Sequence, residues 1–251
     1  MRLILPLLIL VFSSGLTATQ KPLNPLVYLS EQYAPFNYLD EYGLQTGYAI
    51  ELLHQIWYEM GLTPQPIQIL PWARAYSTTR HKNNTLLFSA SRINSREKLF
   101  KWACSIIDLR IVLLGLVSKN LKIASLEEAK KYDIVAINKD VGEQLLLESN
   151  FDLKKVQQVS LLEHGLKMVL MGRVDLLSST ELNAYQKLSE MNLDPDLFEV
   201  VWVLNSYPVC FAFNLNVEEE VVTNFQQALL KVQENKAYIK MLKRKYGLNL
   251  K

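Results

Sequence analysis

The chain has 251 residues, of which 49% are hydrophobic, and carries a formal net charge of +2. Acidic and basic residues are interspersed along it, so its electrostatics give no footprint for nucleic-acid binding. A chain of this length allows either one large domain or two lobes.

The first 20 residues show the pattern of a secretory signal peptide. A single basic residue, Arg2, precedes an apolar run over residues 3–12, and small residues continue to Ala18, where we expect cleavage. No cysteine lies near this position, so we expect no lipid anchor. The apolar run is too short to span a bilayer, and the later apolar stretch 106–117 is interrupted by two charged residues. We therefore expect a periplasmic protein that is secreted through a cleavable signal peptide.

A strand, a loop and a helix follow the leader. Residues 26–29 form a short apolar run typical of a buried strand, and the loop Tyr33-Ala34-Pro35-Phe36 comes shortly after it. In open α/β sheets, ligands bind at this carboxyl edge of the strands. Pro35 restricts its own backbone and that of the residue before it, so we expect Tyr33 and Phe36 to be held on stiff backbone. Two interpretations stay open: these aromatic residues line a binding cleft, or they belong to the core of an ordinary strand-helix unit.

Strand-like and helix-like segments alternate along the rest of the chain. The expected strands cover residues 67–70, 85–90, 109–117, 134–137, 156–159, 175–178, 200–203 and 209–214. The expected helices begin after Gly47 and at Ser125, and further ones cover residues 72–80, 141–148, 163–171 and 218–246. Alternation of this kind favours parallel sheets with covering helices.

Five short motifs occur in a characteristic order. They are the Tyr33-Ala34-Pro35-Phe36 loop, Gly47-Tyr48-Ala49-Ile50-Glu51-Leu52, the arginine-containing segment 89–97, the turn Gly172-Arg173-Val174-Asp175 and a closing helix pair that ends in Lys245-Tyr246-Gly247. Together they resemble the motifs of the extracellular solute-binding proteins of family 3, the polar-amino-acid type that serves ABC transporters. The resemblance runs from residue 26 to residue 246.

The resemblance implies the α/β fold of a type II periplasmic binding protein. Such a protein has two lobes, each a mainly parallel sheet flanked by helices, joined by two crossing strands. With residues 1–20 as the signal peptide, lobe 1 would contain residues 21–107 and 206–251, and lobe 2 residues 108–205. The ligand would bind between the lobes, which close by a hinge motion.

The chain contains only two cysteines, Cys104 and Cys210. Their wide separation is not a metal-site spacing, so they form a disulfide or remain two buried free thiols. We favour the disulfide because an exported chain meets an oxidising compartment, and because both cysteines lie near the expected interlobe crossings at residues 105–109 and 205–208. Such a bond would stiffen the base of the hinge.

Arginine side chains of the first lobe are the main candidates for ligand contacts. Arg96 lies where this family commonly holds a ligand carboxylate, and its planar guanidinium can donate two parallel hydrogen bonds to one. The alternative is a surface ion pair with Glu97 or another neighbour. Arg74, two residues after Trp72 at a helix start, could hold a second anionic group. With Arg92 nearby, this lobe would favour a ligand that carries at least one acidic group.

Other candidates are aromatic, hydroxyl and carboxylate side chains. We expect Trp72 either to stack on the ligand or to cap the core. Ser89 and Ser91 alternate along a strand, so both hydroxyls would point to one side, although serines are also common filler at strand ends. Asp140 and Val141 begin a helix whose free N–H groups can receive an anion, unless Asp140 simply caps that helix.

Thr180 marks a departure from the family pattern. Many amino-acid binders carry an aspartate here that pairs with the ligand ammonium, and threonine supplies no negative charge. Glu181 or Glu31 could compensate, and a ligand other than an ordinary α-amino acid becomes an option. The full set of expected ligand contacts is Glu31, Tyr33, Phe36, Trp72, Arg74, Ser89, Ser91, Arg96, Asp140, Val141 and Thr180.

We expect a receptor for a small polar or anionic metabolite and not an enzyme. The sequence contains no nucleophile elbow, His-Glu-x-x-His motif, Cys-x-x-Cys pair or phosphate-binding glycine loop, and we expect no cofactor and no metal. Glu31 or Glu181 could still act as a base, so a periplasmic dehydratase on the same fold is one alternative, and a ligand-sensing partner of a membrane receptor is another. The expected partners are a small-molecule ligand and the permease of an ABC transporter or a sensor. We expect a monomer and no nucleic-acid partner.

Overall fold

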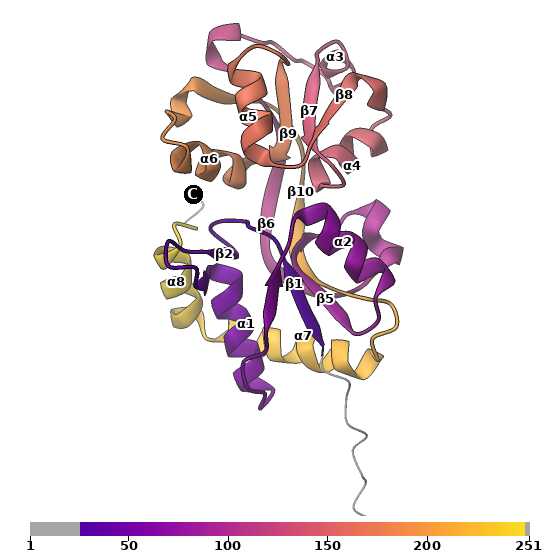
Figure 1. Ribbon diagram of the computed structural model, residues 1–251, viewed down its shortest axis with the longest axis vertical. Coiled ribbons are helices and arrows are strands. Elements are labelled where there is room, and N and C mark those ends of the chain that lie inside the picture. Colours follow the sequence, from indigo (N-terminus) through magenta and orange to yellow (C-terminus); the bar gives the residue numbers. More distant parts are fainter. Residues whose placement is uncertain (1–25, 249–251) are drawn as a thin grey trace, which may run out of the picture.

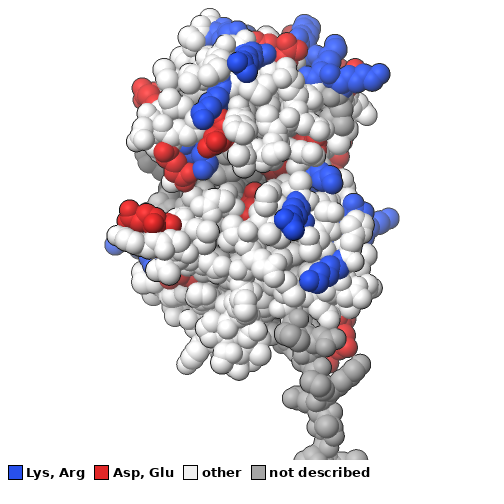
Figure 2. Space-filling model, in the orientation of Figure 1, with Lys and Arg blue, Asp and Glu red and all other residues white. Residues whose placement is uncertain are grey.

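The computed structural model describes residues 26–248 as two lobes stacked along the long axis of the molecule (Figure 1). The expected signal peptide, residues 1–20, lies outside the described residues. Among residues 26–248, no helix combines the length and the apolar character needed to cross a membrane. On the face shown in Figure 2, a waist separates the lobes, and charged side chains of both signs lie in small groups. The two-lobed α/β fold that the sequence predicts is confirmed.

Two long strands join the lobes. β6 (Lys101–Leu116) and β10 (Phe198–Phe213) have 16 residues each, pair antiparallel and pass through both lobes (Figure 1). They lie at the centre of a sheet whose order, within the described residues, is β4-β1-β5-β10-β6-β9-β7-β8. The other strands of this sheet are β1 (Val27–Ser30), β4 (Ile67–Ile69), β5 (Thr85–Ser91), β7 (Ile134–Ile137), β8 (Val156–Val159) and β9 (Leu176–Thr180).

The outer strands of each lobe are parallel. In lobe 1, β1 pairs in parallel with β4 and β5, and in lobe 2, β7 pairs in parallel with β8 and β9. Of these outer strands, β5 and β9 also pair antiparallel, with the crossing strands β10 and β6 respectively. This arrangement matches the expectation of a mainly parallel sheet in each lobe.

The crossing strands are longer than the sequence indicates. The sequence predicts a shorter first strand and a second strand in two pieces, because polar residues interrupt both apolar runs. Asp108 and Arg110 on β6 and Asn205 on β10 are exposed in the structure, where the strands pass from one lobe to the other. Their pairing continues through this crossing because the ladder uses main-chain groups, whatever the polarity of the side chains. We propose lobe boundaries within the crossing, near residues 107 and 205.

Helices cover both faces of the sheet in each lobe (Figure 1). Lobe 1 contains α1 (Tyr48–Glu59), α2 (Trp72–His81), α7 (Glu219–Glu234) and α8 (Lys236–Lys245). Lobe 1 also contains a short hairpin of β2 (Tyr38–Leu39) and β3 (Gln45–Thr46), and the 3-10 segment η1 (Asn94–Leu99). Lobe 2 contains α3 (Leu126–Ala129), α4 (Val141–Glu148), α5 (Leu162–Leu170) and α6 (Glu181–Glu190).

The core of lobe 1 combines side chains from both ends of the described chain. Trp57 of α1 is fully buried and meets the ring of Tyr28 edge to face, with centroids 4.9 Å apart. Phe225 of α7 packs in the same way on Phe211 of β10, at 4.8 Å. Leu242 of α8 is also fully buried in this cluster. The closing helices therefore complete a core that begins with β1.

Gly47 holds the start of α1 against the loop that precedes it. Its φ is +123°, and a Cβ atom at this position would lie 2.3 Å from the carbonyl oxygen of Phe36. This close approach lets the Tyr48 N–H donate to the Pro35 carbonyl at 3.0 Å and the Ala49 N–H to the Phe36 carbonyl at 2.8 Å. The loop that carries Tyr33 is thereby fixed to a buried helix.

We expect Gly47→Ala to lower the free energy of unfolding by about 2–4 kcal/mol, because the new Cβ meets backbone atoms as well as an unfavourable φ. Gly43→Ala is the matched control, since Gly43 also has a positive φ of 76° but has nothing within 4 Å of the added Cβ. Denaturant unfolding of the two variants measures the difference. Equal losses of stability would contradict the role given to the close approach.

A disulfide joins the two crossing strands on the lobe 1 side. Cys104 of β6 and Cys210 of β10 are bonded, with their Cα atoms 4.6 Å apart. The side chain of Gln226 on α7 brackets Cys104, accepting a hydrogen bond from its N–H at 2.7 Å and donating one to its carbonyl at 2.8 Å. Gln233, two turns further along α7, donates to the carbonyl of Ser105 at 2.7 Å. The base of the hinge is thus tied both to the partner strand and to a helix.

We expect the double variant Cys104→Ser/Cys210→Ser to lose about 2–4 kcal/mol of unfolding free energy, because the bond closes a long loop of 106 residues in the unfolded chain. Denaturant unfolding with and without dithiothreitol is the measurement. The reductant should bring the natural protein to the stability of the variant and leave the variant unchanged. A natural protein indifferent to the reductant would show that the bond is absent or contributes nothing.

Candidate functional site

A narrow cavity lies between the lobes. It occupies the region beyond the carboxyl ends of strands from both lobes, which is where open α/β sheets bind ligands. Lobe 1 contributes Glu31 after β1, Tyr33 in the following loop, Trp72 at the start of α2, Ser89 and Ser91 at the end of β5, and Arg96 from η1. Lobe 2 contributes Ile137 at the end of β7, Asp140 and Val141 at the start of α4, and Thr180 and Asn183 at the start of α6.

Arg96 is buried in the wall of this cavity, with 1% of its surface exposed. Its Nη1 donates to the carbonyl of Ser91 at 3.2 Å, its Nη2 to the carbonyl of Lys139 at 3.0 Å, and its Nε to Oε1 of Gln144 at 2.6 Å. Lys139 and Gln144 belong to lobe 2, so two of these hydrogen bonds join the lobes. A guanidinium has five N–H groups, of which three are therefore bonded to the protein itself.

Aromatic rings hold the same guanidinium from the side. The Cζ atom of Arg96 lies 5.1 Å from the ring centroid of Trp72 and 5.2 Å from that of Tyr76. Burial lowers the pKa of Arg96, while the nearby carboxyl of Asp140 acts in the opposite direction. The electron-rich ring faces attract the cation, which offsets part of the cost of removing it from water.

Three further hydrogen bonds cross from lobe 1 to lobe 2. They join Tyr33 Oη and Thr180 Oγ1 at 2.9 Å, Trp72 Nε1 and the Lys139 carbonyl at 2.9 Å, and the Ser95 N–H and Glu148 Oε1 at 2.9 Å. The Lys139 carbonyl thus accepts from both Trp72 and Arg96. The cavity belongs to a closed arrangement of the two lobes.

Two carboxyl groups share the cavity with Arg96. The side chain of Asp140 caps α4 by accepting a hydrogen bond from the N–H of Val141 at 2.6 Å, whereas no hydrogen bond to the Glu31 carboxylate is found among residues 26–248. Burial raises the pKa of Glu31 well above its ordinary value, the negative charge of Asp140 raises it further, and Arg96 opposes both. Burial also raises the pKa of Asp140, against the influence of Arg96 and of the capped N–H.

The raised pKa of Glu31 predicts a pH-dependent stability. Because the folded protein holds this proton more tightly than the unfolded chain, the ligand-free protein loses stability as the pH rises from the unfolded pKa, near 4.5, through the higher folded one. Glu31→Gln removes this loss, so we expect it to match the natural protein near pH 4 and to be more stable than the natural protein near pH 7.

Thermal unfolding of the ligand-free protein from pH 4 to pH 8 measures this difference. Glu220→Gln is the control, because Glu220 is exposed on α7, and this helix lies at the end of lobe 1 that is remote from lobe 2 (Figure 1). The control should follow the natural protein at every pH. A Glu31→Gln variant that does the same would contradict the stated environment of Glu31.

The structure does not bring Phe36 or Arg74 to the cavity. Phe36 is fully buried in the core of lobe 1, where its ring lies 5.2 Å from that of Tyr33, because the chain turns back on itself at Pro35. Arg74 is exposed, because it follows Trp72 by two positions on α2 and so points to the other side of that helix. The sequence interpretation of Arg74 as a second anion-binding group is therefore not supported.

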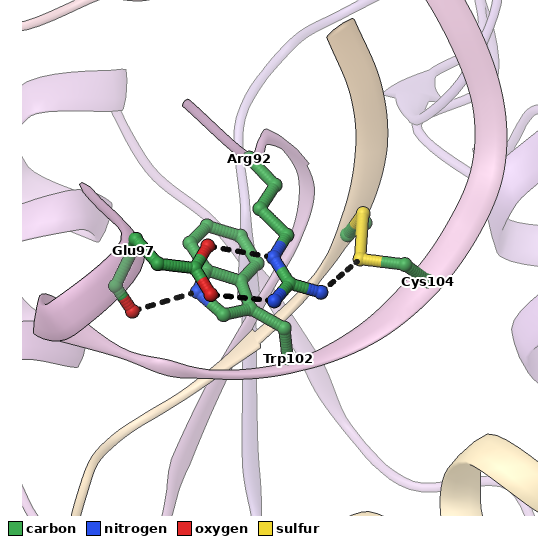
Figure 3. A network of polar contacts seen from close by, with 5 residues as sticks. Arg92, Glu97, Trp102 and Cys104 are labelled. Atoms are coloured by element: carbon green, nitrogen blue, oxygen red, sulfur yellow. Dashed lines mark hydrogen bonds and ion pairs between the residues drawn. A yellow bond between two sulfur atoms is a disulfide. The ribbon is translucent and has the colours of Figure 1, made fainter. Parts of the chain in front are cut away.

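Arg92 is not among the residues that line the cavity, and Figure 3 shows its guanidinium between Glu97, Trp102 and Cys104. Its guanidinium forms an ion pair with Glu97, with distances of 2.5 and 2.8 Å, and lies over the ring of Trp102, 5.9 Å from its centroid. A third nitrogen, Nη1, lies 3.8 Å from Sγ of Cys104 in the hinge disulfide. Glu97 thus pairs with Arg92 and not with Arg96, and lobe 1 presents one arginine to the cavity instead of the expected group.

The sequence analysis does not identify two of the lining residues, Ile137 and Asn183. Ile137 is the last residue of an expected strand, so its position at the sheet edge could have indicated that it lines the cavity. Asn183 lies three residues after Thr180, on the same side of the first turn of α6, which helical spacing could have indicated. Glu181, considered as a compensating acid, instead forms an ion pair with Arg110 of β6 at 3.1 Å.

The fold and the closed interlobe cavity define a two-lobed solute-binding protein. Residues 26–248 match the sequence model of the family described as bacterial extracellular solute-binding proteins, family 3, and the chain belongs to this family. A comparison with curated proteins gives no match.

Solved structures with the same fold include sensors and transport proteins. A histidine kinase sensor domain with similarity to periplasmic binding proteins has a TM-score of 0.76 and 15% identity, covering 89% of this chain and 96% of its own. The arginine-, lysine-, histidine-binding protein ArtJ from Geobacillus stearothermophilus has a TM-score of 0.72 and 16% identity, covering 89% and 95%. A substrate-binding protein of an ABC uptake transporter from Streptococcus pneumoniae, with bound histidine, has a TM-score of 0.76 and 15% identity, covering 88% and 92%. At these identities the likeness concerns the fold alone.

Proposed function

We propose that this protein is a periplasmic receptor that captures a small polar solute, an amino acid or a compound of similar size, and delivers it to the permease of an ABC transporter. The observation that carries the proposal is the closed cavity between the lobes, whose wall combines charged groups, hydroxyls and an amide from both. A solute held by both lobes would favour the closed arrangement, which a membrane partner can distinguish from the open one. The family and the amino-acid-binding proteins of the same fold support this choice.

The charges in the cavity change the expected ligand. The sequence suggested a cationic cleft and hence an acidic group on the ligand, but Arg74 and Arg92 lie outside the cavity. The ionisable groups that line it are Glu31, Asp140 and Arg96, with a formal sum of −1 when all are ionised. A neutral, zwitterionic or cationic solute is therefore a better match than an anion.

We expect saturable one-to-one binding of at least one member of a panel of amino acids, amines, sugars and small carboxylates in isothermal titration calorimetry. Mass spectrometry of the solute after overnight incubation should show it unchanged, because we propose a receptor and not an enzyme. Binding to no member of the panel, or conversion of the bound solute, would contradict the proposal.

Arg96→Ala should weaken the binding of that solute at least tenfold, because the variant loses two interlobe hydrogen bonds and one wall of the cavity. Arg74→Ala, which removes the exposed arginine of α2, is the matched control and should leave the affinity within twofold of the natural protein. Calorimetry on the three proteins compares them directly. Equal affinities for all three would place the binding site elsewhere.

A further inference from the structure

The charged groups of the cavity are arranged unfavourably for a ligand carboxylate. Arg96 is the one basic side chain in the described lining, and Glu31 and Asp140 lie beside it. The two carboxyl groups are close enough to interact with each other and with Arg96, yet no ion pair within 4 Å joins either of them to a basic side chain among residues 26–248. When both carboxyl groups are ionised, a carboxylate that entered the cavity would meet two negative groups and one positive one.

The positive group is partly engaged, because three of its five N–H groups have acceptors within the described residues. Three N–H groups of Arg96 donate to Ser91, Lys139 and Gln144, and two aromatic rings lie close to its guanidinium. A bidentate grip on a carboxylate uses two parallel N–H bonds, and here a donor on each of Nε, Nη1 and Nη2 has a protein acceptor. The guanidinium therefore serves the contact between the lobes.

The first N–H group of α4 is also engaged by the protein itself. A helix N-terminus attracts anions through its free N–H groups, but the Val141 N–H is capped by the Asp140 carboxylate at 2.6 Å. The N–H of Lys139, in the loop just before the helix, donates to the carboxylate of Glu143, also at 2.6 Å. Two carboxylates of this protein thus already accept the N–H groups of Lys139 and Val141, and they place negative charge at the start of this helix.

Glu31, in contrast, is available to a ligand. Its carboxylate lines the cavity and receives no hydrogen bond within the described part of the chain, while its backbone carbonyl accepts from Asn37 at 2.8 Å and keeps the residue in place. The Tyr33 and Thr180 hydroxyls line the same cavity and carry oxygen acceptors. An ammonium group has three donors and a positive charge, and both suit this wall.

We propose that the ligand is a small amine without a carboxylate group, held by Glu31 and Asp140. The inference rests on the proposed function, because it concerns the solute of the same cavity. An amine brings a positive charge that, together with that of Arg96, balances the two ionised carboxylates, and it leaves the interlobe hydrogen bonds of Arg96 unbroken. Thr180 is uncharged and is hydrogen-bonded to Tyr33, so the pairing with the ammonium is left to Glu31 and Asp140.

Matched pairs of probes that differ only by the carboxylate test this inference. The pairs are arginine and agmatine, histidine and histamine, lysine and cadaverine, and ornithine and putrescine, each titrated into the protein by calorimetry at pH 7. In at least one pair we expect the amine to bind ten times more tightly than its amino acid, or more. An amino acid that binds as tightly as its amine, or more tightly, overturns the inference and leaves the receptor function intact.

Binding of none of the eight probes also overturns the inference. If the wider panel then contains a ligand, the receptor function stands, and if it contains none, both proposals fail. For an amine that binds, Glu31→Gln and Asp140→Asn should each reduce the affinity at least tenfold, and Glu220→Gln should leave it unchanged. Thermal unfolding of each variant verifies that it is folded, and an unchanged amine affinity in both cavity variants would contradict the assignment of the two carboxylates.

Discussion

The antiparallel pair of β6 and β10 is the constraint on which the whole structure depends. Each strand belongs to the sheets of both lobes, so the pair fixes where the strand ends of one lobe lie relative to those of the other. The disulfide between Cys104 and Cys210 and the side chain of Gln226 hold this pair on the lobe 1 side. Between this fixed part and lobe 2 lies the stretch that includes the exposed residues Asp108 and Asn205.

The burial of Arg96 is the second feature that shapes the site. Removing a guanidinium from water is costly, and the structure offsets this cost with three acceptors and two aromatic rings. Two of the acceptors belong to lobe 2, so much of this compensation exists only when the lobes are closed. Arg96 therefore links the electrostatics of the cavity to the conformation of the whole protein.

Local patterns in the sequence predict much of this fold. Hydrophobic periodicity predicts most of the strands and helices. At Ser125, the predicted helix cap is present as a hydrogen bond from the Glu128 N–H to the Ser125 hydroxyl. Asp140 caps its helix, which is one of the two roles that the sequence leaves open for it. Nine of the eleven expected contact residues line one cavity, because residues at the carboxyl ends of neighbouring strands must converge. These features depend on short stretches of chain.

The directions of the arginine side chains could not be predicted in the same way. Arg92 and Arg96 are four residues apart, yet Glu97 and Trp102 hold the first outside the cavity, and lobe 2 groups more than 40 residues away hold the second inside it. Only the packing of both lobes decides between these outcomes. Arg74 is the exception, because the expected helix start at Trp72 already implied that it points away.

The core of lobe 1 has a consequence for how the chain is made. Tyr28 and Trp57 emerge early in synthesis, but Phe225 and Leu242, which are buried in the same cluster, emerge last. The elements of lobe 2, from β7 to α6, are complete before that point. Lobe 2 can thus reach its own packing while lobe 1 still lacks two helices, and the core of lobe 1 stays incomplete until the segment that carries α7 and α8 has been made.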